Sequence, residues 1–348
     1  MRNYILKRLG LMLITFVIII FLIFVFIKLM PNFYEVGIDQ DPQIYEAWLE
    51  SQGFNKPILT QFFIWLGNIF KHGDFGISFH KNNAPVAQYV LSRLPRTIRI
   101  NIFPFLISVP IGITLGIVAA LRKNKMTDHV ISIGVMFFIS VPSFVVAVIL
   151  QYYMVYEWKI LPDARVDNLA PLFSKRAILT RILPIFVLSV GTIAGWTRSL
   201  RAELTETLTS EFMLLARAKG LTKGQATVRH ALRNAFVPFA PAILGGFISL
   251  LGGSLIIERT FGITGIGGAF IEALERPKGI PDYPMIMMLN MFYVSIGLLA
   301  AIVADLSYGV IDPRIRMGAG KQWCKILKDL KKKILFLLMM KLLLKTKV

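Results

Sequence analysis

Reactive side chains are sparse in this sequence, and their spacing matches no familiar catalytic or metal-binding motif. The stretch Gly318-Ala319-Gly320-Lys321 looks like the end of a nucleotide-binding loop, but Gln322 follows it and the leading glycine is absent. The four histidines are scattered without the spacing of metal ligands: His72, His80, His129 and His230. We therefore expect that the chain is not an enzyme and holds neither a cofactor nor a metal.

Asp305 is the one acidic residue in a predicted membrane-spanning segment that could carry a proton. It lies near the predicted cytoplasmic end of that segment, close to Arg314 and Arg316, so the sequence favours a structural ion pair and leaves a proton site as the alternative. Cys324 is the only cysteine, which excludes a disulfide within the chain.

A charged stretch over residues 210–238 lies between two long apolar segments and is too polar to be buried in lipid. Good helix formers over residues 211–219 predict a short helix that ends at Gly220, a natural left-handed stop. A second helix is expected over residues 225–236, before Pro238. An ordinary solvated loop that obeys membrane topology is the alternative. The basic residues of the stretch are Arg217, Lys219, Lys223, Arg229 and Arg233.

Composition places the chain in a membrane. It has 348 residues, of which 55% are hydrophobic, and a formal net charge of +19. Soluble domains contain about 45–50% apolar residues and rarely arrange them in blocks of about 20. The basic residues flank these blocks on alternate sides, which favours membrane topology and contact with anionic lipid and argues against a nucleic-acid partner.

Six segments are long enough to cross a hydrocarbon core about 30 Å thick, although the fourth is short. Their predicted ranges are residues 9–27, 98–121, 130–153, 182–196, 239–257 and 285–304. Arg2, Lys7 and Arg8 precede the first segment, which is predicted to be an uncleaved helix rather than a signal peptide. We therefore expect an all-α integral membrane protein of six transmembrane helices with both termini in the cytoplasm.

The loop between the third and fourth segments is more basic than an external loop should be. Glu157, Asp163 and Asp167 offset its charge only in part. Its basic residues are Lys159, Arg165, Lys175, Arg176 and Arg181.

Four regions follow from these segments: residues 1–30 are the N-terminal tail and first helix, 31–97 an external segment, 98–316 a five-helix core, and 317–348 a basic tail. The core includes a cytoplasmic loop over residues 198–238. Glycine pairs at 245–246 and 252–253 allow close helix approach, at a dimer interface or along a translocation path. The tail is expected either to lie on anionic lipid or to be a disordered or degenerate extension.

The charged stretch carries a recognisable pattern. Ala216-Arg217-Ala218-Lys219-Gly220-Leu221, followed by His230-Ala231-Leu232-Arg233-Asn234, resembles the coupling-loop signature of permease subunits in binding-protein-dependent, ATP-driven importers of the peptide and nickel type. Leu214 and Leu215 depart from the Glu-Ala of the wider superfamily, and its proline is displaced to Pro238. Further segments resemble the same family at residues 54–58, 73–79, 94–97, 261–268, 282–284 and 311–316.

The resemblance implies a B-type permease subunit with type I ABC importer architecture in the bacterial cytoplasmic membrane. Its expected partners are a homologous second permease subunit, two ATPase subunits that bind the ATP, an extracytoplasmic substrate-binding protein, a peptide substrate and membrane lipid. The short helix would sit in a groove of an ATPase subunit. The residues assigned to coupling are Ala216, Arg217, Ala218, Lys219, Gly220, His230 and Leu232.

Other functions stay open at the level of sequence. Nickel or another small solute is an alternative cargo within the same family. An ion-coupled secondary transporter would require inverted repeats and embedded charges, neither of which is evident. A membrane scaffold without transport activity is a third class. The scarcity of charges in the predicted spans indicates a permissive path with no fixed-charge selector, which favours dipeptides or oligopeptides.

Overall fold

The computed structural model describes residues 2–29, 56–81, 84–171, 173–275 and 281–311. Within these residues the chain is helical, and the only β pairing is an isolated antiparallel bridge between Ile77 and Pro85. Cys324, the Walker-like stretch at 318–321, the basic tail and the arginines expected near Asp305 lie outside the described residues.

The α-helices are α1 (Arg2–Leu29), α3 (Ile58–His72), α4 (Val86–Leu121), α5 (Met126–Ser140), α6 (Ser143–Gln151), α7 (Lys175–Leu208), α8 (Glu211–Ala218), α9 (Lys223–Ala226), α10 (Leu232–Ser249), α11 (Leu255–Thr260), α12 (Ile266–Leu274) and α13 (Tyr283–Ile311). Two π-helical turns, Tyr152–Glu157 and Thr227–Ala231, follow α6 and α9, and a 3₁₀ turn, Leu250–Gly252, follows α10.

Among the described residues, five helical stretches are long and apolar enough to cross a membrane, or six if a bent pair forms one span. The bent pair overturns one prediction: the segment expected as a single third span is two helices, α5 and α6, at 90° to each other. Val141 is extended between them because Pro142 disfavours the helical conformation of the preceding residue.

Other spans differ from the prediction in length. Helix α4 begins at Val86 rather than at residue 98, and α7 covers Lys175–Leu208 rather than the short segment 182–196. The 36 residues of α4 make a rod about 54 Å long, which exceeds the hydrocarbon thickness of about 30 Å. The added turns carry charged residues, so a hydropathy pattern misses them.

The predicted fifth span is not one continuous helix. Helix α10 ends at Ser249, and α11 starts at Leu255 after a break at Gly253, whose φ is +68°. A Cβ at Gly253 would lie 2.3 Å from Glu258 Oε1, so only glycine allows the backbone to pass that side chain.

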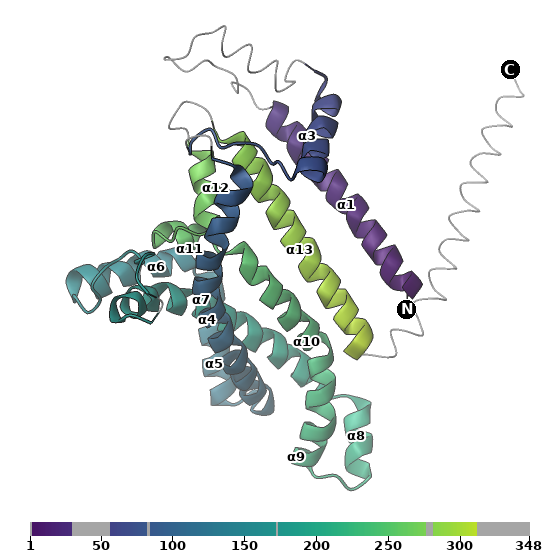
Figure 1. Ribbon diagram of the computed structural model, residues 1–348. Coiled ribbons are helices and arrows are strands. Elements are labelled where there is room, and N and C mark those ends of the chain that lie inside the picture. Colours follow the sequence, from purple (N-terminus) through teal and green to yellow (C-terminus); the bar gives the residue numbers. More distant parts are fainter. Residues whose placement is uncertain (1, 30–55, 82–83, 172, 276–280, 312–348) are drawn as a thin grey trace, which may run out of the picture.

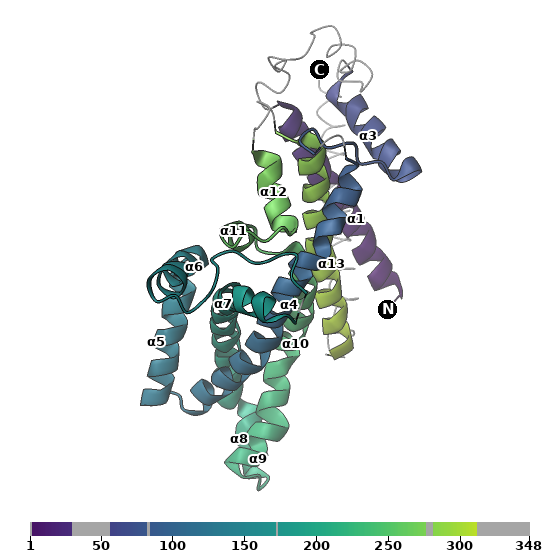
Figure 2. The same cartoon turned by 60° about the vertical axis from the view of Figure 1, so that its left-hand side comes forward.

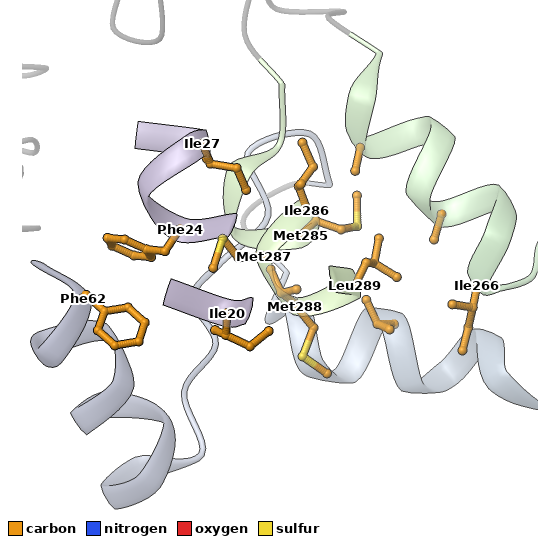
Figure 3. Packing of buried hydrophobic residues seen from close by; sticks show 14 residues of the cluster. Ile20, Phe24, Ile27, Phe62, Ile266, Met285, Ile286, Met287, Met288 and Leu289 are labelled. Atoms are coloured by element: carbon orange, nitrogen blue, oxygen red, sulfur yellow. The ribbon is translucent and has the colours of Figure 1, made fainter. Parts of the chain in front are cut away.

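The helices form an elongated molecule with two distinct ends. Helices α3 and α12 lie at one end and α8 and α9 at the opposite end, with α4, α7, α10 and α13 running between them (Figures 1 and 2). Helix α1 packs alongside α13. Figure 3 shows the apolar cluster at the α3–α12 end, in which Phe62 of α3 lies beside Phe24 of α1, and Ile20 of α1 lies beside Met288 of α13.

The closest helix packing joins α4 to α7. A Cβ at Gly112 would lie 2.5 Å from Trp196 Cβ, and a Cβ at Gly116 would lie 3.0 Å from Leu200 Cβ, so this Gly-x-x-x-Gly pair brings the two backbones together. The glycines singled out in the fifth span also have contacts inside the chain. Gly245 lies against the backbone of Ala300 on α13, and Gly246 lies against aromatic rings.

Candidate functional site

The α8–α9 hairpin (residues 211–226) is the candidate site, and its turn is closed by main-chain hydrogen bonds. Leu221 N donates to Ala216 O at 3.3 Å, and Gly220 N donates to Arg217 O at 3.0 Å. This is the Schellman pattern, which requires a left-handed residue after the helix, and Gly220 has a φ of +88°. The predicted stop at Gly220 is confirmed, with the regular helix ending at Ala218.

The second helix of the hairpin, α9, starts with a capping box. Thr222 Oγ1 accepts from Gln225 N at 3.3 Å, and Gln225 Oε1 accepts from Thr222 N at 3.1 Å. The helical run then continues through a π-helical turn into α10. The prediction that a separate second helix ends before Pro238 is therefore wrong, because helix α10 continues through Pro238 and Pro241.

The inner face of the hairpin packs on the body of the protein. Met213 and Ala216 of α8 are buried with Leu200 and Leu204 of α7, and Leu221 packs against the same cluster. Burial of these small and apolar side chains stabilises the packing of α8 against α7 and against the helical segment that follows Gly220. The hairpin is thus a docked element rather than a solvated loop.

The outer face of the hairpin is apolar and basic. Leu214 and Leu215 are 65% and 57% exposed, and Arg217 and Lys219 are exposed beside them. In the part of the chain that the structure describes, none of the stretch's basic residues forms an ion pair. These charges and leucines therefore face outward together: Leu214, Leu215, Arg217, Lys219, Lys223, Arg229 and Arg233.

The residues predicted for coupling separate into two groups. Arg217, Ala218, Lys219 and Gly220 are exposed at the tip of the hairpin, and His230 is exposed in the π-helical turn. The inward group is Ala216, which is buried, and Leu232, which packs against the same apolar cluster.

A buried ion pair between α5 and α7 escaped the sequence analysis. Asp128 of α5 is 2% exposed, and both of its oxygens accept from Arg201 of α7, at 2.6 and 2.8 Å. Asp128 also accepts from Asn124 N, which fixes the connection between α4 and α5. Its partner is 73 residues away in sequence, so no local pattern signals the pair.

A second buried carboxylate lies where α4, α11 and α12 meet. Glu258 is fully buried; Oε1 accepts from Thr97 Oγ1 at 3.0 Å and Oε2 from Gly268 N at 3.0 Å. Thr97 Oγ1 in turn accepts from Ile266 N. The glycines around this site give the carboxylate room, as at Gly265 and Gly267.

The α3–α12 end contains a cluster centred on Glu272. Its carboxylate oxygens lie 2.9 Å from Lys81 Nζ and 2.9 Å from Arg93 Nη1, and Tyr89 donates to it at 3.0 Å. Burial alone would raise the pKa of Glu272, but the hydrogen bond of Lys81 and the charge of Arg93 outweigh it, so the pKa lies below its usual value. Glu272 likewise raises the pKa of Lys81 against the effect of partial burial.

Asp305 forms an ion pair, as favoured from the sequence, but with a different partner. Its Oδ2 accepts from Arg8 Nη1 of α1. The pair joins α1 to α13. Across the described ranges, no group of three or more His, Cys, Asp and Glu side chains is arranged to hold a metal ion.

Comparison with known proteins gives a consistent picture. Residues 112–317 match the family model described as binding-protein-dependent transport system inner membrane component, and residues 1–101 match the model for the N-terminal part of such components. The chain is 33% identical over 317 residues to the dipeptide transport system permease protein DppB of Lactococcus lactis, covering 91% of this chain and 100% of that protein.

A second relative and one solved structure also resemble the chain. The chain is 31% identical to the oligopeptide transport system permease protein AppB of Bacillus subtilis, covering 90% of this chain and 99% of that one. Among solved structures, the methionine ABC transporter MetNI in an inward-facing form aligns with a TM-score of 0.47 and 16% identity, covering 65% of this chain and 97% of that chain.

Proposed function

Since the chain belongs to the family of binding-protein-dependent transport system inner membrane components, we propose that it is one of two homologous permease subunits in an ATP-driven importer of peptides. It is a multi-pass protein of the inner membrane and lines half of the translocation path. Two ATPase subunits bind and hydrolyse the ATP, and an extracytoplasmic binding protein delivers the solute. The architecture is that of type I importers, with six spans and both termini in the cytoplasm.

Peptides are the proposed cargo because of the relatives. The Lactococcus protein is named for dipeptides and the Bacillus protein for oligopeptides, and each aligns over nearly its whole length.

The α8–α9 hairpin carries the coupling proposal. Its outer face offers two exposed leucines beside Arg217 and Lys219, a combination that fits a groove with an apolar floor and acidic rims. Helix α9 continues through a π-helical turn into α10 without a break. When the ATPase subunits close, a displaced hairpin therefore moves the end of the fifth span with it.

We propose different roles for the coupling residues on the two faces of the hairpin. Ala216 and Leu232 pack inward, so we assign them to holding the hairpin on the body. Arg217 and Lys219 are the proposed charged contacts with the ATPase. Gly220 sets the direction of α9 relative to α8, since its left-handed conformation allows a sharp turn between the two helices.

A conformational substitution tests this proposal. A Cβ at Gly220 meets no heavy atom within 4 Å, so replacement by valine acts through the backbone rather than through crowding. A β-branched residue at positive φ costs roughly 1–2 kcal/mol. We expect Gly220→Val to insert into the membrane normally and to reduce peptide uptake about tenfold, measured with the assembled importer in proteoliposomes.

Gly220→Asn is the matched control, because asparagine tolerates the left-handed conformation while adding a similar volume. It should retain most of the uptake. Normal uptake by Gly220→Val, with normal ATPase assembly, would contradict the coupling role of the hairpin.

A further inference from the structure

Helix α3 is too short to cross a membrane and too apolar for an ordinary external loop. Its 15 residues make a rod about 22 Å long, whereas the hydrocarbon core of a bilayer is about 30 Å thick. The sequence of the helix, ILTQFFIWLGNIFKH, contains no acidic residue and is rich in aromatic side chains. A helix of this composition exposes apolar surface unless another layer covers it.

One side of α3 packs on the last turns of α1. The ring centroid of Phe62 lies 5.1 Å from that of Phe21 and 5.4 Å from that of Phe24, and the Trp65 ring also contacts Phe24 (Figure 3). Phe62 and Ile69 are buried, and Ile58 and Trp65 are partly buried. The fold therefore uses one apolar stripe of the helix, which consists of Ile58, Phe62, Trp65 and Ile69.

A second apolar stripe lies about 100° further around the same helix, because neighbouring residues of an α-helix are rotated by that angle. Its members have the same helical spacing: Leu59, Phe63 and Phe70 are 55%, 62% and 74% exposed, and Leu66 is partly buried. The remaining side carries the polar residues Thr60, Gln61, Asn68, Lys71 and His72, with Ile64 among them. Helix α3 is thus amphipathic, and the fold covers only part of its apolar side.

The position of α3 along α1 matches the edge of a bilayer. The apolar span of α1 ends at Leu29. At about 1.5 Å per residue, Phe24 and Phe21 lie roughly 8 and 12 Å before that end. Amphipathic helices on membranes bury their apolar side about 5–10 Å into the boundary between headgroups and acyl chains. Packing on Phe21 and Phe24 therefore places α3 at about the depth of an interfacial helix.

Two further observations favour phospholipid as the layer that covers the second stripe. The same turns of α1 also expose large apolar side chains, namely Leu22, Phe26 and Leu29. Lipid covers the exposed residues of both helices at once, whereas a soluble protein cannot reach side chains of α1 that lie within the bilayer. Lys56 precedes α3 and Lys71 lies in its last turn; both are exposed and suit the phosphates of lipid headgroups.

On this geometry we propose that α3 lies in the membrane–water interface of the leaflet opposite to the α8–α9 hairpin. Leu59, Phe63, Leu66 and Phe70 contact acyl chains, and the polar side of the helix faces headgroups and water. The inference goes beyond the proposed function and does not depend on the transported solute, since it concerns only the membrane contact of α1 and α3. Lipid bound by α3 holds the end of α1 in place, in addition to the packing of α1 against α13.

Spin labelling of the full-length chain tests the position of α3. Cys324→Ser removes the only cysteine, so that a single new cysteine can then be labelled. Phe63→Cys and Phe70→Cys place the label on the second apolar stripe. Thr60→Cys and Asn68→Cys are the matched controls on the polar side of the same helix. All of these positions are exposed, so a label disturbs no buried packing.

The accessibility of each label to oxygen, which concentrates among acyl chains, and to a water-soluble nickel chelate is measured by electron paramagnetic resonance. The samples are the subunit alone in liposomes, the assembled importer in liposomes, and the importer with its binding protein added.

We expect the ratio of oxygen to nickel accessibility to be at least about threefold higher at positions 63 and 70 than at positions 60 and 68, in every sample. Equal ratios on the two sides of the helix, with the nickel chelate reaching positions 63 and 70, would overturn the proposal because the stripe would then lie in water.

Labels at positions 63 and 70 that are shielded from both reagents would also overturn the proposal. Shielding in the subunit alone would assign the stripe to other residues of this chain, and shielding that appears only with the other proteins would assign it to one of them. An importer that shows the expected ratios but takes up no peptide would instead contradict the proposed function and support the interfacial position of α3.

Discussion

The two ends of the molecule differ in whether their charged side chains form ion pairs within the chain. At the α3–α12 end, Glu272 pairs with both Lys81 and Arg93, and Arg93 is largely buried. At the hairpin end, Arg217 and Lys219 are exposed and form no ion pair within the described chain. Paired charges stabilise the chain that holds them, while outward, unpaired charges are available to another protein. The comparison therefore separates a cluster whose charges are paired within the chain from a surface whose charges fit the proposed contact with an ATPase subunit.

The largest effect on stability is expected for Glu272→Gln. The change leaves Arg93 buried with only neutral partners, which costs about 2 kcal/mol after allowance for the partial exposure of the site. Thermal unfolding of the purified subunit in detergent measures it. The control is Glu275→Gln, which removes the exposed pair between Glu275 and Arg259 and should cost less than about 1 kcal/mol. Equal destabilisation by the two variants would remove the distinction between buried and exposed pairs.

The difference between wild type and Glu272→Gln should depend on pH in a defined direction. Because the folded-state pKa of Glu272 is lowered, its contribution is fully present above the ordinary value of 4.5 and is lost as pH falls through the lower folded pKa. The gap in unfolding free energy between the two proteins should therefore shrink in acid below pH 4.5. A gap that widened in acid would contradict the ion-pair assignment.

The smallest effect on stability is expected at the hairpin. The double variant Arg217→Gln and Lys219→Gln should change the unfolding free energy by less than about 0.5 kcal/mol, since neither side chain has an internal partner. It should nevertheless weaken retention of the ATPase subunits several-fold in pull-down experiments, with a reduced dependence on salt. Full retention of the ATPase would contradict a role of Arg217 and Lys219 in ATPase binding. Clear destabilisation of the subunit would show that these charges stabilise the fold, as Glu272 is expected to do.

Much of the fold follows from local sequence. Blocks of apolar residues predict membrane helices, and Gly220 after a run of helix formers predicts the helix stop that the main-chain hydrogen bonds of Leu221 confirm. Such features depend on residues a few positions apart. Span boundaries are less predictable, because α4 and α7 continue through charged turns that hydropathy assigns to loops.

The sequence by itself determined the membrane class of the protein, the family pattern around the hairpin and the position of its turn, since each is written in neighbouring residues. Only the tertiary structure decided which charges meet. Asp128 with Arg201 and Glu272 with Arg93 come from distant segments. Their partnership depends on how α4, α5, α7 and α12 pack, and the close approach of α4 and α7 at Gly112 is a property of the folded helices rather than of either helix alone.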